Sequence, residues 1–402
     1  MQNIFLKKIQ IPKKYNLDLF KEFIESEKSS GYLLVLLTII SMLIANSSLG
    51  KEYIKIFHSY LDLSFSTIQL NYNVEQWIND GLMTVFFLLV GLEIEREIYV
   101  GELSTIKKAG LPVIAAAGGM LIPAVIHLSL NIGTPTQRGF GIPMATDIAF
   151  TLGILSLLGN RVPVSIKIFL TALAIIDDLG AIIIIAVFYT NQLSFIYLLS
   201  ALGIFAFLIF LNKKNVNSLP VYLIMGIIMW YAMLKSGVHP TITGVLLAFA
   251  IPFRKSGEQN ISYSLQKWLH KPVAFFILPL FAIVNTAIEI PKDIISSLTS
   301  ANSAGIITGL VAGKLIGIFT FTYLAVKLNI SILPKDLNWR FIAGASCLAG
   351  IGFTMSIFIT NLAFMDPVIL TASKLSIIFA STISAIIGAT MLKLSKNQEE
   401  NS

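Results

Sequence analysis

Two carboxylates lie side by side in a segment that is otherwise almost entirely apolar. The stretch AIIDDLGAIIIIAVF runs from Ala174 to Phe188 and contains Asp177 and Asp178. Such a run is typical of a membrane-spanning helix, where a charged residue costs about 2.5–3.5 kcal/mol at the centre. Adjacent helix positions point about 100° apart, so the two carboxylates face different directions. One of them can face a cation cavity while the other reaches a basic partner.

Two more ionisable residues lie in apolar segments. Asp147 is found in GIPMATDIAFTLG and Lys314 in LVAGKLIGIF. Four such residues together cost roughly 10 kcal/mol, which is similar to the whole net stability of a typical domain. A purely structural ion pair would account for Lys314 and one aspartate, but it would leave two carboxylates unexplained. Hard oxygen ligands suit alkali and alkaline-earth cations, and Thr146 adds a hydroxyl oxygen beside Asp147.

Two of the apolar segments are expected to be interrupted helices. Segment 138–157 contains a glycine, a proline and the polar pair Thr146-Asp147, and segment 341–362 contains three glycines in GASCLAGIGFTMS. Interrupted helices in separate halves of a chain indicate a transport site near the membrane midplane. We expect Asp147 to offset the positive half-helix ends and Lys314 the negative ones. Close helix packing is the alternative explanation for the glycines of the second segment.

The composition places these segments in an all-α, polytopic membrane protein. Of the 402 residues, 55% are hydrophobic and only 13% are charged, against about 25% charged in a soluble domain. Apolar runs long enough to cross a bilayer recur along the chain. The twelve predicted transmembrane helices lie near 31–49, 77–98, 109–130, 138–157, 164–188, 195–211, 218–234, 239–253, 272–290, 304–327, 341–362 and 370–393.

Composition also excludes several classes of protein. The net charge of +7 comes from bases scattered over short loops, so no nucleic-acid partner is expected. The single cysteine, Cys347, excludes an internal disulfide and a cysteine-rich metal site. No signal peptide is predicted, and the first apolar span is expected to act as an uncleaved anchor.

The distribution of lysine and arginine predicts the orientation. An even number of spans places both termini on the same side, and cytoplasmic loops are richer in bases. With the termini inside, outer loops contain only six of the 29 bases: Lys51, Lys55, Arg138, Lys235, Lys292 and Lys374. We therefore expect a cytoplasmic N-terminal segment over 1–30, a transmembrane domain over 31–393 and a cytoplasmic tail over 394–402.

Two pieces outside the membrane carry recognisable patterns. Residues 17–24 place four large apolar side chains on one helical face, which indicates a short interfacial helix. Within the outer loop 50–76, residues 61–74 alternate between apolar and polar, which indicates a β-hairpin; an ordinary loop is the alternative. An isolated hairpin is marginally stable in water, so we expect it to pair with another surface, such as a second copy in a homodimer.

The ordered motifs resemble the NhaA-type sodium/proton antiporters of bacteria. The resemblance covers about 31–393 and is carried by FFLLVGLEIERE (86–97), PMATDIAF (143–150), FLTALAIIDDLGAI (169–182), SGVHPTITGV (236–245), ILPLFAIVNTAI (277–288), GLVAGKLIGI (309–318) and LAGIGFTMSIFI (348–359). It implies inverted repeats in which the fourth and eleventh helices are discontinuous and cross. It also implies a multi-pass protein of the bacterial inner membrane.

The resemblance implies roles for individual residues. Asp178 would be the principal ion-binding carboxylate, and Asp177 its partner, bridged to Lys314 when sodium is absent. Asp147 and Thr146 would lie at the helix crossing. The charges that line the water-filled funnels would be Asp80, Glu93, Arg96 and Glu97. His239 would take part in the pH response.

The sequence departs from the family pattern at the inner start of the ninth span. Where the family commonly has an acidic residue followed by histidine, this chain has Gln266 and Lys267, while His270 is retained. The pH at which this chain becomes active therefore does not follow from the family pattern. His270 is either a pH sensor or an interfacial histidine. His58 and His127 are expected to be ordinary loop or interfacial residues.

The expected mechanism is competition between protons and Na⁺ or Li⁺ for the same carboxylates. A low-dielectric cavity with two neighbouring carboxylates favours any cation that relieves their repulsion. The resemblance implies two protons per sodium, so one net charge crosses and exchange is electrogenic. Acid pH should stop exchange. No cofactor and no enzymatic activity are expected.

Three other classes fit the residues less well. A passive cation channel needs a multi-site pore lined by carbonyls or charged rings. An intramembrane aspartyl protease would need two aspartates such as Asp147 and Asp178, but the YD and GxGD patterns are missing. A sugar or amino-acid transporter would need aromatic and amide groups in the spans.

Overall fold

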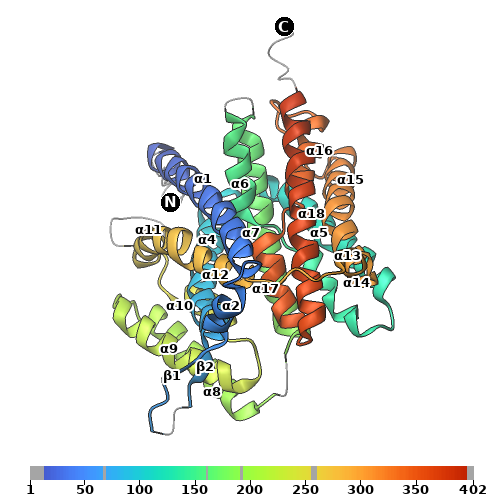
Figure 1. The fold of residues 1–402 in the computed structure, drawn as a ribbon. Coiled ribbons are helices and arrows are strands. Elements are labelled where there is room, and N and C mark those ends of the chain that lie inside the picture. The colour runs from blue at the N-terminus through green and yellow to red at the C-terminus, as the bar shows by residue number, and fades with distance from the viewer. Residues whose placement is uncertain (1–12, 67–68, 160–161, 191–192, 255–259, 396–402) are drawn as a thin grey trace, which may run out of the picture.

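Helices make up almost all of the part of the chain that the structure describes (Figure 1). The computed structural model describes residues 13–66, 69–159, 162–190, 193–254 and 260–395, without the side chains of 13–28 and 106–108. The α-helices are α1 (Lys13–Ala45), α2 (Gly50–His58), α3 (Val74–Gln76), α4 (Met83–Tyr99), α5 (Ile106–Asn131), α6 (Ile148–Leu157), α7 (Val164–Phe188), α8 (Phe195–Lys213), α9 (Leu219–Ser236), α10 (Ile242–Ala250), α11 (Ile261–Pro272), α12 (Leu278–Asn285), α13 (Ile294–Thr299), α14 (Ala301–Thr308), α15 (Lys314–Lys327), α16 (Trp339–Leu348), α17 (Phe353–Ala363) and α18 (Pro367–Leu394). Shorter 3₁₀ and π-helical turns are η1 (Trp77–Leu82), η2 (Glu102–Ser104), η3 (Pro135–Met144), η5 (Val273–Ile277) and η6 (Gly309–Gly313).

Within the described residues, eight helical segments are long and apolar enough to cross a membrane, and the number rises to eleven if each of three bent pairs counts as one span. The eight are Val74–Tyr99, Ala109–Asn131, Val164–Phe188, Phe195–Lys213, Leu219–Ser236, Ile261–Asn285, Ala301–Lys327 and Pro367–Leu394. The prediction of an all-α, multi-pass protein is therefore confirmed. The predicted span 239–253 contains only the nine-residue helix α10, and about 14 Å of helix cannot cross a 30 Å hydrocarbon core alone.

Both predicted interruptions are present. The chain bends by 43° between η3 and α6, and by 46° between α16 and α17. The first break follows Pro143 and leaves Ala145 and Asp147 in extended conformations. At the second break Gly350 lies directly against the backbone carbonyl of Leu310, so a side chain there would collide with the backbone. Glycine is therefore required at this close approach.

Helices α5 and α15 pack closely enough for their backbones to touch. Gly118 and Gly317 face each other, and a Cβ added to either would collide with the other's carbonyl oxygen. Small residues at such positions allow helices to approach within a membrane. This approach fixes the start of α15, where Lys314 lies, against the centre of the molecule.

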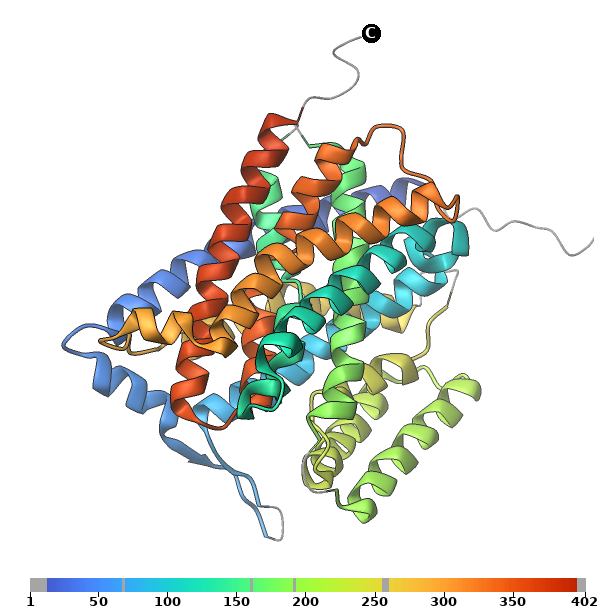
Figure 2. The ribbon, with the colours of Figure 1, turned by 90° about the vertical axis from the view of Figure 1, so that its right-hand side faces the viewer.

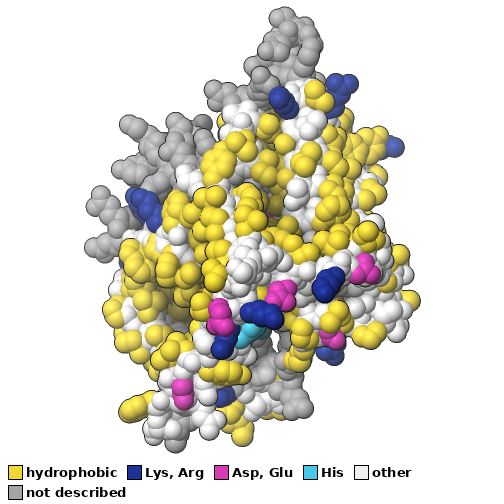
Figure 3. Space-filling model, viewed as in Figure 1, with side chains coloured by type: hydrophobic (Ala, Val, Ile, Leu, Met, Phe, Trp, Pro, Cys, Tyr) yellow, Lys and Arg dark blue, Asp and Glu magenta, His cyan; other side chains and the backbone are white. Residues whose placement is uncertain are grey.

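On the face of the molecule that Figure 3 shows, hydrophobic side chains cover much of the surface. On α8, for example, Phe195, Ile196 and Leu199 are 69%, 78% and 67% exposed. Apolar area of this extent on a helix surface fits hydrocarbon and not water. The long apolar helices and this surface together describe a multi-pass membrane protein.

The predicted β-hairpin is confirmed. Strands β1 (Tyr60–Asp62) and β2 (Asn71–Asn73) pair antiparallel, with Leu61 opposite Tyr72. The hairpin projects from the end of the molecule opposite to the C-terminal end of α18 (Figures 1 and 2). It is also held within the chain, because the Trp77 indole N–H donates to the carbonyl of Leu61 over 3.1 Å.

Three boundaries differ from the sequence predictions. Residues 50–58 form helix α2 where a loop was expected, and α2 is bent by 113° relative to the helix that ends at Ala45. Residues 17–24 are helical, but they continue without a break into the first span. Residues 261–271, expected in an inner loop, form α11 and extend the ninth span at its start. The predicted terminal segments lie partly in 1–12 and 396–402, outside the described residues.

Candidate functional site

A cluster of buried polar side chains lies where α7, α15 and the break between η3 and α6 meet. Its members are exposed by 4% or less: Thr146, Asp147, Asp177, Asp178 and Lys314. These are the five residues that the sequence analysis placed at the ion site, and the fold brings them together. Asp178 lies near enough to interact electrostatically with Asp147, Asp177, Glu93 and Lys314.

Lys314 and Asp177 form a dry ion pair at the centre of this cluster. The Lys314 ammonium donates to Asp177 Oδ2 over 2.5 Å, and both side chains are 0% exposed. The ammonium also donates to the Thr146 hydroxyl over 2.9 Å. Buried pairs need this close geometry, since their mutual attraction must offset the loss of water around both charges.

Thr146 connects the ion pair to the second interrupted helix. Its hydroxyl lies 2.7 Å from Asp177 Oδ2 and 2.9 Å from the carbonyl oxygen of Ala349, just after α16. A hydroxyl has one proton, which it can donate to one of these two oxygens at a time. The sequence analysis expected Lys314 itself to face the negative helix ends. Among the described residues, its ammonium bonds Thr146 and Asp177 instead, and Thr146 contacts the carbonyl.

Two carboxylate oxygens of the cluster have no hydrogen-bond partner within the described part of the chain. They are Asp177 Oδ1 and Asp178 Oδ1, and both atoms are buried. Buried polar atoms are nearly always satisfied, so unpartnered ones indicate a role other than holding the fold together. Buried carboxylate oxygens without a hydrogen-bond partner are suited to bind a proton or a hard cation.

Asp147 occupies the N-termini of two half-helices at once. Its Oδ1 accepts from the backbone N–H of Phe150 (3.0 Å), at the start of α6. Its Oδ2 accepts from the backbone N–H (2.9 Å) and the hydroxyl (2.5 Å) of Thr354, at the start of α17. The Asp147 N–H in turn donates to the Ile351 carbonyl over 2.7 Å. The carboxylate thus lies where two positive helix ends converge, as the sequence predicted. Thr354 itself was missed.

A cavity of about 390 Å³ lies at the hairpin end of the molecule and contains two more predicted residues. His239 Nε2 is 3.3 Å from Asp80 Oδ1, while His239 Nδ1 is 2.7 Å from the Thr241 hydroxyl. Phe358, on α17, packs edge-on against the imidazole. The structure therefore brings Asp80 and His239 together beside α17, one half of an interrupted helix.

The remaining predicted charges lie at the opposite end of α4. Glu93 is buried, and the Gln266 side chain lies close to its carboxylate. Arg96 donates to Glu97 Oε1 over 2.9 Å. Gln266, one of the positions where the chain departs from the family pattern, thus contacts one of the predicted charges. His270 lies in the last turn of the same helix, α11.

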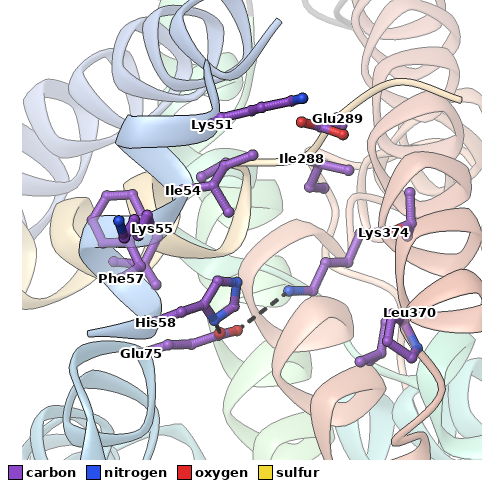
Figure 4. Close-up of a pocket in the computed structure, with 14 residues that line it drawn as sticks. Lys51, Ile54, Lys55, Phe57, His58, Glu75, Ile288, Glu289, Leu370 and Lys374 are labelled. Atoms are coloured by element: carbon purple, nitrogen blue, oxygen red, sulfur yellow. Dashed lines mark ion pairs between the residues drawn. The ribbon is translucent and has the colours of Figure 1, made fainter. Parts of the chain in front are cut away.

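A second ion pair was not foreseen. Lys374, expected in an outer loop, lies inside α18 and is 8% exposed. Its ammonium is 3.8 Å from Glu75 Oε1, and Glu75 Oε2 is 3.6 Å from His58 Nδ1. Figure 4 shows Glu75 between these two bases, in a cavity of about 630 Å³ between α2 and α18. Glu75 is therefore the acidic partner of Lys374 among the described residues.

His127 is also not the loop or interfacial residue that was expected. It is 0% exposed within α5, and its Nε2 lies 3.2 Å from Asn302 Oδ1. The Asn302 amide N–H donates to the Ser373 hydroxyl over 2.7 Å, so Asn302 Oδ1 accepts a hydrogen bond from the His127 Nε2–H. The imidazole therefore joins α5, α14 and α18. Asn302 lies 175 positions from His127, so no local pattern indicates this contact.

The fold and the cluster define a multi-pass membrane protein with an ionisable centre between interrupted helices. The family model described as Na⁺/H⁺ antiporter 1 matches residues 21–392. A protein named Na(+)/H(+) antiporter NhaA from Cytophaga hutchinsonii is 56% identical over 376 residues, covering 94% of this chain and 95% of the relative. Na(+)/H(+) antiporter NhaA 1 from Flavobacterium johnsoniae is 59% identical, covering 93% and 96%.

A more distant relative matches over its full length. Na(+)/H(+) antiporter NhaA 2 from Aliarcobacter butzleri is 48% identical, covering 96% of this chain and 100% of the relative. The chain belongs to the NhaA family of Na⁺/H⁺ antiporters, and the resemblance carried by the motifs is confirmed.

Proposed function

We propose that this chain exchanges Na⁺ or Li⁺ for protons by competition at Asp177 and Asp178. The observation that carries the proposal is the pair of buried, unpartnered oxygens on these two carboxylates, beside the dry Lys314 pair. Family membership supports the same conclusion, since the relatives are named as Na⁺/H⁺ antiporters. The exchanged ions are substrates of transport, and the chain acts as a secondary transporter without cofactor or chemical catalysis.

The exchange follows from the electrostatics of the cluster. Two charged carboxylates in a water-excluded cavity repel each other and lack solvation. A proton or a desolvated sodium ion relieves both penalties, so protons and sodium ions compete for the same carboxylates. Sodium binding therefore releases protons, and protonation releases sodium. If the cavity opens to one side at a time, this competition becomes coupled counterflow.

The Lys314–Asp177 pair provides for the second proton. Asp178 is free to bind sodium, while Asp177 is held by Lys314 and Thr146. Recruiting Asp177 to sodium would break its pair with Lys314 and leave an ammonium without its counter-ion. The two protons of a 2:1 exchange are then carried by Asp177 and Asp178, or by Asp178 and Lys314. One net charge crosses in each cycle, which is worth about 2.3 kcal/mol per 100 mV.

The interrupted helices supply the moving part. We propose that η3–α6 and α16–α17 are the fourth and eleventh of twelve spans and cross as equivalent members of inverted repeats. The contacts from Asp147 to Thr354 and Ile351 join the two breaks. Small rotations of the half-helices about this point would expose the cluster to one side or the other.

The orientation follows from the charges in the loops. We propose that both termini are cytoplasmic, in a bacterial inner membrane, with the hairpin and the cavity of Asp80 and His239 on the outer side. An interior-negative potential then drives sodium outward. The hairpin Tyr60–Asn73 is proposed to join two copies in a homodimer, since its strand edges can pair with another chain.

The pH response is assigned to groups at both entrances. His239, facing Asp80, would act at the outer side, and Glu93, Arg96, Glu97 and His270 at the inner side. Gln266 cannot titrate, so its contact with Glu93 gives this chain a different inner cluster from relatives with an acid there.

The decisive test is sodium-driven proton flux in proteoliposomes. Asp178→Asn removes the charge but keeps the shape, and it is expected to lower the flux at least about 100-fold. Asp336→Asn is the matched control, because Asp336 is exposed in the loop before α16, and its flux should equal that of the wild type. Undiminished flux in Asp178→Asn would overturn the site assignment.

Proton release offers a test that is independent of transport. Sodium added to the purified protein should release protons into a weakly buffered solution, and the apparent affinity should weaken as the pH falls. The same titration on Asp178→Asn should show neither effect. Sodium binding without proton release would contradict competition even if transport were observed.

A further inference from the structure

Lys374 is a buried cation that the proposed exchange does not use. It lies near the start of α18, and its nearest acceptors are Asn285 Oδ1 at 3.3 Å and Glu75 Oε1 at 3.8 Å. Both distances are long for an ammonium, which can donate three hydrogen bonds. A charge retained in a membrane span with such loose contacts requires a functional explanation.

An asparagine holds Lys374 at this position. Asn285, at the end of α12, accepts from Asn361 over 2.6 Å and from Lys374 with the same oxygen, which uses both of its lone pairs. Its amide N–H donates to Asn79 Oδ1 over 2.9 Å. The contacts join α18, which carries Lys374, to three other segments of the chain, α12, α17 and η1.

Glu75 lies between two cavities. It lines the cavity of about 630 Å³ that contains Lys374 and His58, and also the cavity of about 390 Å³ that contains Asp80 and His239. Its side chain is 24% exposed. The carboxylate therefore contributes to the field in the smaller cavity, where Asp80 is a second acid and the Asn79 and Asn361 amides supply polar groups.

We propose that Lys374 is an internal counter-ion for Glu75 that weakens sodium binding in the outer cavity and so allows exported sodium to leave. The inference deepens the proposed function and rests on its orientation. Without Lys374, Glu75 and Asp80 together would attract and retain a cation near the exit. With Lys374 fixed beside Glu75, the attraction is reduced without any loss of polar lining.

The size of the effect can be bounded. Removing a unit charge about 4 Å from a carboxylate changes the affinity of that carboxylate for a cation by roughly fivefold in a water-like medium. The change is larger where water is excluded. Because the cavity is open to water, we expect the lower end of this range. The effect should be confined to the outer face, since Glu75 lies at the hairpin end of the molecule.

The experiment compares the sodium concentration that half-saturates exchange on each face. Everted membrane vesicles present the cytoplasmic face to added sodium, and right-side-out vesicles present the outer face. Lys374→Met should lower the half-saturating concentration at the outer face about fivefold and leave the inner face within about twofold. Glu75→Gln should raise it at the outer face, and the double variant should behave like Glu75→Gln.

Two variants control for general effects of substitution. Lys374→Arg keeps the charge and should retain the wild-type asymmetry between faces. Lys55→Met removes an exposed lysine of the same larger cavity, and screening by water should keep its shift below about twofold. A shift of equal size at both faces, or no shift in Lys374→Met, would overturn the proposal. If Lys374→Met does not fold, an unchanged outer value in Glu75→Gln overturns it.

Failure of the proposal and failure of the proposed function give different results. If wild-type vesicles show no sodium-driven proton movement, or if Asp178→Asn is fully active, the exchange mechanism itself is wrong. If wild type exchanges and Asp178→Asn does not, the mechanism stands and the Lys374 variants alone decide the role of Lys374.

Discussion

Among the described residues, two lysines are buried within the candidate membrane spans, and their surroundings differ. Lys314 is 2.5 Å from Asp177, with both side chains 0% exposed, whereas Lys374 is 3.8 Å from Glu75, with side chains 10% and 24% exposed. In the first pair protein groups replace water entirely, so separating the charges requires a substitute ion. In the second pair water can solvate either charge, so separation is cheap. In the proposed mechanism, one fold uses the same residue types for a coupled step and for tuning of an exit path.

The largest effect is expected from Lys314→Met. This variant leaves Asp177 buried without its counter-ion, which should lower the free energy of unfolding by about 3–5 kcal/mol. Denaturant unfolding in detergent micelles at about pH 8 would measure it. The double variant Lys314→Met/Asp177→Asn should regain most of the loss. A loss below about 1 kcal/mol in the single variant would mean that this pair is not dry.

A smaller effect is expected from Lys374→Met in the same unfolding measurement. Because Glu75 stays partly hydrated, the loss should be about 1 kcal/mol or less. Added choline chloride, which screens charges without supplying a transported ion, should reduce the loss further. If salt has no influence on the Lys374 variant, the proposed difference between the two pairs is wrong.

The smallest effect concerns Asp62, a carboxylate exposed in the hairpin. Hydrogen bonds from the hydroxyl and backbone N–H of Ser64 lower the pKa of Asp62. Its ionised form therefore stabilises the hairpin above the ordinary value of about 3.9, and this contribution is lost as the pH falls through the lower folded value. Fluorescence of Trp77, which bonds Leu61, should report a small acid transition that is missing in Asp62→Asn.

Much of the central cluster was predictable, because charged residues in apolar runs are rare and costly. Asp147, Asp177, Asp178 and Lys314 could be found from hydropathy alone, and proline and glycine marked the interruptions. Since adjacent helix positions diverge, it was also foreseeable that Asp177 and Asp178 could not both contact one lysine. Each of these inferences depends on local sequence and helix geometry.

The contacts between distant segments could not be predicted from the sequence. Thr354 lies 207 positions from Asp147, and nothing in its neighbourhood indicates a capping partner. Lys374 near a span boundary reads as a loop residue unless Glu75 is known to face it. Helix α2 was missed because a nine-residue amphipathic helix in a charged loop is a weak signal beside the hairpin pattern.

The position of Asp147 has a mechanical consequence. Each of its oxygens already accepts a hydrogen bond, one set from α6 and the other from α17. A cation that coordinated this carboxylate would compete with these donors for its negative charge and weaken its hold on both helix ends. Cation binding at the centre and the relative tilt of α6 and α17 are consequently linked through the Asp147 side chain, although the two helices lie some 200 residues apart in the sequence. No separate relay is required.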